Sequence, residues 1–84
     1  MPTISTFYGI VIMMRQPDKE HNPPHIHALY SGQEASFAIS DGKILDGKLP
    51  NRAIAMVREF ILINQNELLT MWNTRVFKKL KGLE

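Results

Sequence analysis

The stretch HIHALYSGQEASFAI, residues 25–39, decides the fold. Two runs of strand-forming residues, His25–Tyr30 and Gln33–Ile39, flank Ser31-Gly32, which fits a two-residue hairpin turn. When Tyr30 lies opposite Gln33, apolar residues collect on one face and the histidines on the other: Ile26–Phe37 and Ala28–Ala35 on the first, and His25–Ala38, His27–Ser36 and Leu29–Glu34 on the second. A shift of one residue would mix the two sets, so the pattern predicts this register.

The segment HNPPHIH, residues 21–27, leads into this hairpin and carries all three histidines of the chain. Pro23 and Pro24 hold the backbone in an extended form and remove two N–H donors. His25 and His27 follow at a spacing of two, which points both imidazoles to the same side of a strand. Such a rigid segment can present two imidazoles to a metal ion, a phosphate or a shared proton.

The remaining strands are predicted on either side of the hairpin. Residues 4–14 are rich in β-branched and apolar side chains, which indicates a first strand buried on both faces. Asp41-Gly42 is a second turn signal, and it places Ile39 opposite Ile44 in a short strand that runs through Leu45. The sheet is therefore expected to be an antiparallel meander of three to four strands.

Two helices are predicted after Gly47. Pro50 suits the first position of a helix whose core stripe is Ile54, Val57 and Ile61. Further apolar residues lie off that stripe, so this helix should cover the sheet and also touch a second surface, either the second helix or a partner subunit of a homo-oligomer. Asn64 and Glu67 have the spacing of a capping box, and the second helix then carries a stripe of four residues: Leu68, Trp72, Val76 and Leu80.

The predicted architecture is α+β in two layers, with both C-terminal helices on one face of the sheet and a single domain over residues 1–84. Trp72 is expected in the core, with base stacking as the alternative. Because both helices belong to the apolar side, the histidine face should be covered by solvent, a ligand or another molecule.

Composition excludes several classes of protein. The chain has no cysteine, which removes disulfides and thiolate metal sites. Its apolar runs are far shorter than the roughly 20 residues of a membrane span, and no signal peptide is evident, so a cytoplasmic protein is expected.

The net charge is only +2. Basic residues crowd the C-terminal end and predict either a solvated last helical turn or a phosphate-binding patch: Arg75, Lys78, Lys79 and Lys81.

Three segments resemble a small prokaryotic family catalogued as "domain of unknown function forty-one sixty": MPTIS with FYGI at the start, HNPPHIHA at residues 21–28, and GKLP at residues 47–50. The resemblance runs in order over about the first 75 residues. It implies a component of a two-gene, toxin–antitoxin-like module, encoded beside another small protein, and it implies no catalytic residues.

Four hypotheses follow for the histidine segment. The favoured one is a module that binds RNA, DNA or a cognate protein through the histidine face, with His21, Glu34 and Ser36 beside the pair and Arg75, Lys78 and Lys79 as supporting cations. A metal-free endoribonuclease would use His25 and His27 as catalytic acid and base, with Lys43, Arg15 or Arg52 on the phosphate.

The third hypothesis is a divalent metal site, in which His25 and His27 supply two ligands and His21, Glu34 or Glu20 a third. No cofactor is certain from the sequence. The fourth is purely structural: hydrogen bonds from His21 and His25 stiffen the loop, while His27 lies in a dimer interface.

Overall fold

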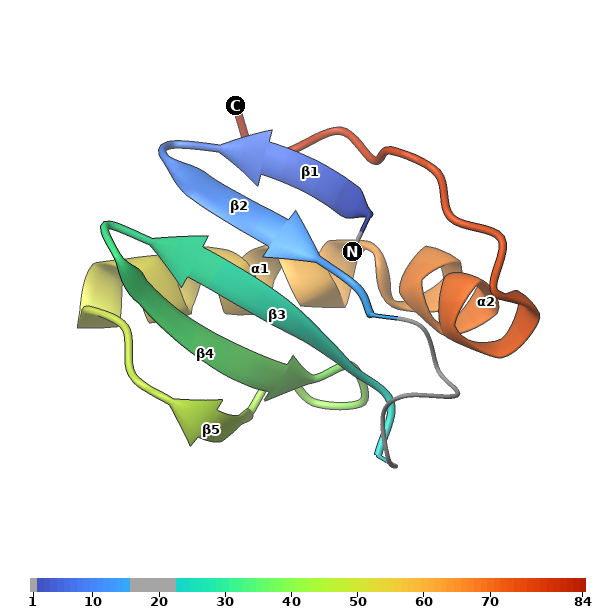
Figure 1. The fold of residues 1–84 in the computed structure, drawn as a ribbon, viewed down its shortest axis with the longest axis horizontal. Coiled ribbons are helices and arrows are strands. Elements are labelled where there is room, and N and C mark those ends of the chain that lie inside the picture. The colour runs from blue at the N-terminus through green and yellow to red at the C-terminus, as the bar shows by residue number, and fades with distance from the viewer. Residues whose placement is uncertain (1, 16–22) are drawn as a thin grey trace.

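The structure is a computed structural model that describes residues 2–15 and 23–84. These residues form one antiparallel sheet in chain order followed by two helices: β1 (Thr3–Phe7), β2 (Ile10–Met13), β3 (His25–Tyr30), β4 (Gln33–Ala38), β5 (Ile44–Gly47), α1 (Asn51–Ile63) and α2 (Gln65–Thr74). Figure 1 shows α1 crossing the far face of the sheet and α2 beyond the ends of the strands. The α+β class is confirmed. The sheet in this part of the chain has five strands rather than three to four.

The β3–β4 hairpin has the predicted register throughout, from His25 opposite Ala38 to Tyr30 opposite Gln33. Ser31 and Gly32 form its turn with φ of 51° and 80°. Two successive left-handed residues are the signature of a type I′ turn, whose twist matches that of the strands it joins. The register therefore follows from the alternation of side chains together with a two-residue loop.

The prediction of a single strand over residues 4–14 is wrong, because this segment forms the β1–β2 hairpin. Tyr8 and Gly9 make a second left-handed turn with φ of 49° and 78°, and Phe7 pairs with Ile10. Burial on both faces is also incorrect: Ile10 and Ile12 are fully buried, whereas the alternate residues of β2 are only half-buried.

The predicted pairing of Ile39 with Ile44 is wrong as well, because Ile44 lies opposite Phe37 and β5 continues to Gly47. A longer loop separates β4 from β5, closed by hydrogen bonds from the Ala38 N–H to the Lys43 carbonyl and from the Gly42 N–H to the Ala38 carbonyl, both 2.8 Å. Ile39 is fully buried within that loop. A bulge at Ser36–Phe37 shifts the β4–β5 register.

Helix α1 begins after Pro50 and buries Ala53, Val57, Phe60 and Ile61, which confirms the predicted core stripe apart from Ile54, which is only half-buried. The predicted capping box is absent, because the Asn64 side chain makes no cap hydrogen bond and its Nδ2 donates instead to the Phe60 carbonyl, 2.9 Å away. In the described part of the chain, no helix has the length and apolar content needed to cross a membrane.

Helix α2 buries Leu68, Met71 and Trp72, so the core position predicted for Trp72 is confirmed. The helix ends at Thr74 because Arg75 adopts a left-handed conformation with φ of 62°, and the Arg75 N–H closes the last turn on the Met71 carbonyl, 2.9 Å away. The predicted continuation of the helical stripe through Val76 and Leu80 is therefore wrong.

The segment from residue 75 to residue 84 has no regular secondary structure and runs past β1 (Figure 1). The Leu80 N–H donates to the Ile4 carbonyl at 2.7 Å, and the Tyr8 N–H donates to Glu84 Oε1 at 3.1 Å. The basic residues of this segment therefore do not form the last helical turn that was predicted for them. Arg75 instead caps α2, Lys78 pairs with Glu67 of α2, and Lys79 lines a hollow beside β1. Residues 75–84 are here called the C-terminal strap.

Candidate functional site

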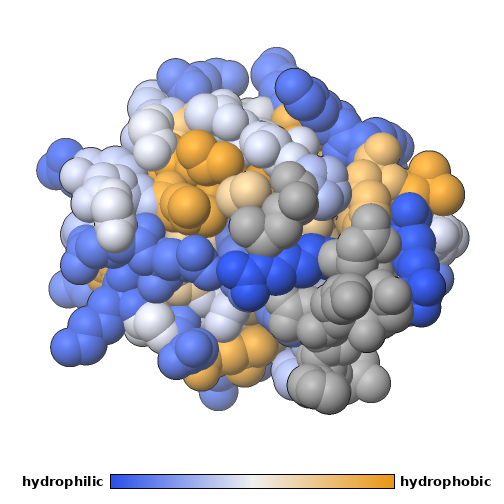
Figure 2. All heavy atoms as spheres, in the orientation of Figure 1, coloured by the Kyte–Doolittle hydropathy of each residue, from blue (hydrophilic) through white to orange (hydrophobic). Residues whose placement is uncertain are grey.

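The sheet face opposite α1, here called the open face, is built from alternate residues of each strand. Because paired residues on adjacent strands point to the same side, the register arranges this face in two rows: Thr6, Val11, Leu29 and Glu34 in the first, and Thr3, Met13, His27, Ser36 and Asp46 in the second. Val11, Met13 and Leu29 are half-buried. Figure 2 views this face and shows apolar side chains over β2 and β3 bordered by hydrophilic ones.

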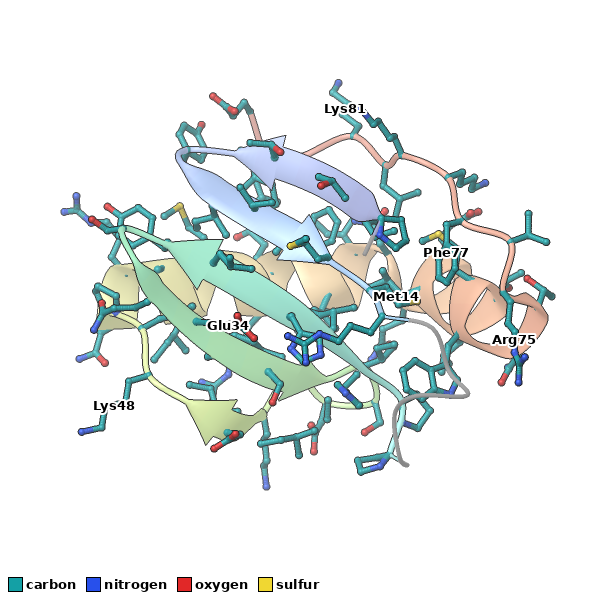
Figure 3. The ribbon with its side chains drawn as sticks, viewed as in Figure 1. Met14, Glu34, Lys48, Arg75, Phe77 and Lys81 are labelled. Atoms are coloured by element: carbon teal, nitrogen blue, oxygen red, sulfur yellow. The ribbon has the colours of Figure 1, made fainter. Side chains whose placement is uncertain are left out.

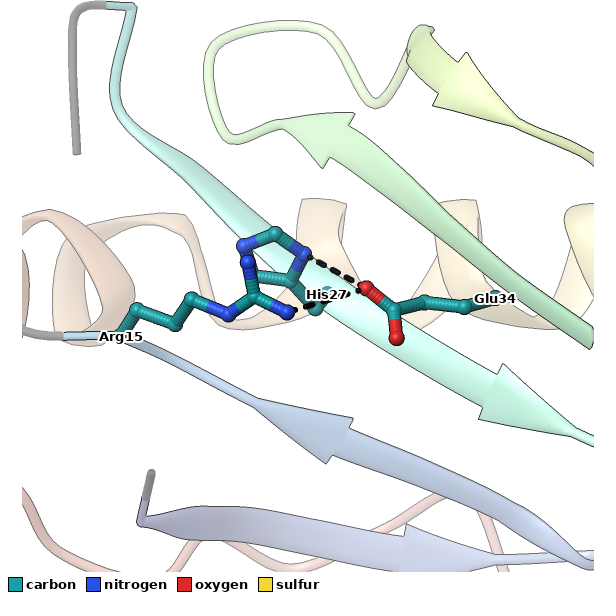
Figure 4. Close-up of polar contacts among 3 residues, drawn as sticks. All are labelled: Arg15, His27 and Glu34. Atoms are coloured by element: carbon teal, nitrogen blue, oxygen red, sulfur yellow. Dashed lines mark hydrogen bonds and ion pairs between the residues drawn. The ribbon is translucent and has the colours of Figure 1, made fainter.

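A charged cluster lies next to these apolar residues (Figure 4). Glu34 Oε2 lies 3.3 Å from Nη2 of Arg15 and 3.3 Å from Nδ1 of His27. The side chains of Arg15 and Glu34 are 38% and 43% exposed, whereas that of His27 is 8% exposed. One carboxylate oxygen thus joins an exposed guanidinium to a buried imidazole.

A small hollow of about 140 Å³ opens beside this cluster. It is lined by Arg15, His27, Glu34, Ala35, Ser36, Asp46 and Gly47. Its polar lining carries two carboxylates, a hydroxyl, an imidazole and a guanidinium, so it suits a small polar group that both donates and accepts hydrogen bonds.

His25 lies deeper than the open face. Its Nδ1–H donates to the Pro23 carbonyl at 2.8 Å, because a carbonyl can only accept. Its ring packs edge-on against His27 with centroids 5.2 Å apart, and it packs in a tilted arrangement against Trp72 of α2 with centroids 5.1 Å apart. The two imidazoles therefore lie on the same side of β3, as the spacing predicts.

The histidine pair is nevertheless buried. Taken as whole residues, backbone included, His25 is 8% exposed and His27 is 6% exposed. The expectation that the helices leave this pair uncovered is wrong for His25, because Trp72 of α2 contacts its ring. The strand spacing gives the side on which a residue lies, whereas this contact depends on where α2 packs at the end of the sheet. On the open face only a small part of His27 is accessible, and Glu34 and Ser36 lie beside it.

The structure brings His25, His27, Glu34 and Ser36 together, as predicted. It does not bring the C-terminal cations to them: Arg75 and Lys81 lie far from Glu34 in Figure 3. Of the other predicted binding residues, Lys78 forms an ion pair with Glu67 at 2.6 Å, and Lys79 lines a hollow against β1. His21 falls outside the described residues.

Arg15 and Asp46 both line the hollow beside Glu34. From the sequence, Arg15 is expected only on a phosphate, and no role is predicted for Asp46. Asp46 lies opposite Ser36 only because the bulge shifts β5, and no local pattern indicates that bulge. The observed β2–β3 register places Met13 opposite His27, which brings Arg15, two residues on, close to the histidines.

The metal hypothesis needs a third ligand beside the two imidazoles. Among residues 2–15 and 23–84, no group of three or more histidine, aspartate or glutamate side chains could hold a metal ion. Two of the three candidates for the third ligand, His21 and Glu20, lie outside those ranges. A divalent metal site therefore stays a prediction from the sequence.

Comparison with known proteins gives one family. A family model described as "Domain of unknown function (DUF4160)" matches residues 9–73, which is more than half of the chain and confirms the family resemblance. The matched span runs from the β1–β2 turn almost to the end of α2 and includes the whole charged cluster. No curated protein and no solved structure gives a significant match.

Proposed function

This chain belongs to the family described as Domain of unknown function (DUF4160), and from that premise we propose that it is a protein-binding module that docks a cognate protein on its open face. The observation that carries the proposal is a continuous apolar patch formed by Val11, Met13 and Leu29. These side chains occupy adjacent positions on β2 and β3, are partly exposed, and border the charged cluster around Glu34. An apolar centre with a polar rim is the usual anatomy of a protein interface.

The charges on the open face favour a protein over a nucleic acid. Binding to a phosphate backbone needs cations that are free to neutralise phosphates. Arg15 is already paired with Glu34, and Asp46 adds a further negative charge to the hollow that both line. Arg75 and Lys81 lie far from Glu34 (Figure 3), and Lys78 is already paired with Glu67. Lys79 lines a hollow with Thr3 and Thr6 at the β1 edge of the sheet, away from the charged cluster. A partner with an apolar surface and a basic fringe matches the open face better.

The partner we propose is the small protein encoded beside this chain, in a cytoplasmic, toxin–antitoxin-like module of a prokaryote. The family resemblance suggests this arrangement, and the open face offers a surface for it. Within such a pair, the complex would bury the apolar centre and leave Glu34 and Asp46 at its rim.

Isothermal titration calorimetry of the full chain against that small protein tests the proposal. Leu29→Lys and Val11→Lys each place a charge in the proposed apolar centre and should weaken binding by about a hundredfold or more, because burying an unpaired charge costs several kcal/mol. Val76→Lys is the matched control, since Val76 is largely exposed on the C-terminal strap. Unchanged affinity in both open-face variants, or salt-dependent binding of RNA or DNA through this face, would overturn the proposal.

A second candidate, a histidine-dependent endoribonuclease, is favoured by one contact. Glu34 Oε2 lies 3.3 Å from His27 Nδ1, and a carboxylate at one ring nitrogen can orient an imidazole for proton transfer at the other. The candidate predicts that purified chain cleaves RNA and that His27→Gln abolishes cleavage while Val11→Lys does not. Absence of cleavage in wild-type chain would remove this candidate and leave the binding module.

A further inference from the structure

The outward side of α1 carries apolar residues that the described part of the chain does not cover. Leu62 is 57% exposed and Ile63 is 67% exposed, whereas the inward side of the helix is fully buried in the core. An open hollow along this side is lined by Ala55, Arg58, Glu59, Leu62 and Ile63. The sequence predicts a second contact surface for this helix, and α2 does not supply it at these positions.

The outward side has a simple layout. Ala55 and Leu62 are seven residues apart and therefore lie on nearly the same line along the helix, since a turn has about 3.6 residues. Arg58 and Glu59 lie on opposite sides of that line, near its middle. Both are exposed, and neither forms an ion pair within the described residues. The Arg58 Nε–H donates to the Gly42 carbonyl at 3.0 Å, which fixes that side chain on its flank.

We propose that this side of α1 binds a second copy of the chain, with the two α1 helices parallel around a twofold axis. In that arrangement Leu62 packs against the partner's Leu62, and Arg58 meets the partner's Glu59 on both flanks. An antiparallel pair would place Arg58 beside the partner's Arg58 and Glu59 beside the partner's Glu59, because flanks of the same kind then face each other. The charges therefore select the parallel pair, and the interface is self-complementary.

This dimer is independent of the proposed function. Helix α1 lies across the far face of the sheet from the open face (Figure 1), so a partner protein and a second copy can bind at the same time. Loss of the dimer would leave the open face unchanged, and loss of partner binding would leave the dimer intact.

Sedimentation equilibrium of the full chain, from micromolar to millimolar concentration, tests the inference. Wild-type chain should dimerise. Arg58→Glu and Glu59→Arg should each weaken association by about tenfold or more, because each sets like charges against each other on both flanks. An equimolar mixture of the two variants should recover association, since the mixed dimer pairs opposite charges on both flanks. Lys48→Glu is the control, an equal charge reversal on the exposed segment after β5 (Figure 3).

Circular dichroism melts of each variant establish that it is folded, which matters most for Arg58→Glu because Arg58 also bonds to Gly42. Leu62→Glu is a second route, because its exposed side chain has little part in the core, and it should abolish the dimer while preserving the fold. A monomeric wild type at millimolar concentration would overturn the inference. So would a mixture that associates no better than its two components, or a Leu62→Glu variant that dimerises like wild type.

Discussion

Glu34 Oε2 lies 3.3 Å from Nδ1 of His27, across the β3–β4 pair of strands, and places a half-exposed carboxylate against a nearly buried imidazole. The same oxygen lies 3.3 Å from Arg15 Nη2. This arrangement connects the surface charge of the open face with the histidine pair beneath it, so a partner that displaces Arg15 from Glu34 also changes the environment of His27.

Glu34→Gln should lower the free energy of unfolding by less than about 1 kcal/mol, because an ion pair with more than a third of each side chain in solvent contributes little. Urea unfolding of the two proteins measures this change. Glu67→Gln is the matched control, since it removes the exposed Glu67–Lys78 pair on α2 and the C-terminal strap. Only Glu34→Gln should also weaken binding of the proposed partner. A loss of stability above about 3 kcal/mol would show that Glu34 is a buried ionic partner instead.

The sequence predicted the central hairpin because its information is local. Alternating apolar and polar residues over 25–38 and a two-residue turn leave one register compatible with a single buried face. The β1–β2 turn was missed because a tyrosine at φ of 49° is uncommon, and Gly9 alone signalled the turn. The early end of α2 was missed for the same reason, since Arg75 adopts the left-handed conformation that usually favours glycine.

The strand register predicts one part of the candidate site, the residues that adjacent strands place on the same face. His27, Glu34 and Ser36 gather because adjacent strands place them on the same face. The burial of His25 against Trp72 depends instead on where α2 packs, and the position of Asp46 depends on a bulge. Contacts between distant segments are set by packing of the whole core, and no local pattern encodes them.

Gly47→Ala should destabilise the protein by more than about 1 kcal/mol, because the position has φ of 85° and an added Cβ would clash with the Glu34 carbonyl oxygen. That neighbour is backbone, so β4 and β5 must separate to relieve the clash. Gly32→Ala is the matched control: its φ is 80°, and an added Cβ would meet nothing within 4 Å. Urea unfolding should show a clearly larger loss for Gly47→Ala. Equal losses would mean that the left-handed conformation alone decides the cost.

His25→Ala should lower the free energy of unfolding by about 2 kcal/mol or more, since it removes a buried ring and the hydrogen bond to the Pro23 carbonyl. Trp72 is the only tryptophan of the chain and contacts His25, so its fluorescence reports on this change. The emission of folded His25→Ala should shift to longer wavelength as water approaches the indole. His25→Phe keeps an aromatic ring and should shift it less. An unchanged spectrum in His25→Ala would contradict the observed packing of the two rings.

Ser5→Ala should leave the free energy of unfolding unchanged or raise it by up to about 1 kcal/mol. The hydroxyl of Ser5 is buried on β1 and has no hydrogen-bond partner in the described structure. A buried hydroxyl without a partner costs about 1–3 kcal/mol relative to water, and alanine removes that cost while leaving most of the packing intact. Ser36→Ala is the comparison. Ser36 is half-buried on the open face, so its hydroxyl lies closer to solvent and its removal should change the free energy of unfolding little. A loss above about 1 kcal/mol in Ser5→Ala alone, measured by urea unfolding, would mean that the hydroxyl forms a hydrogen bond in solution.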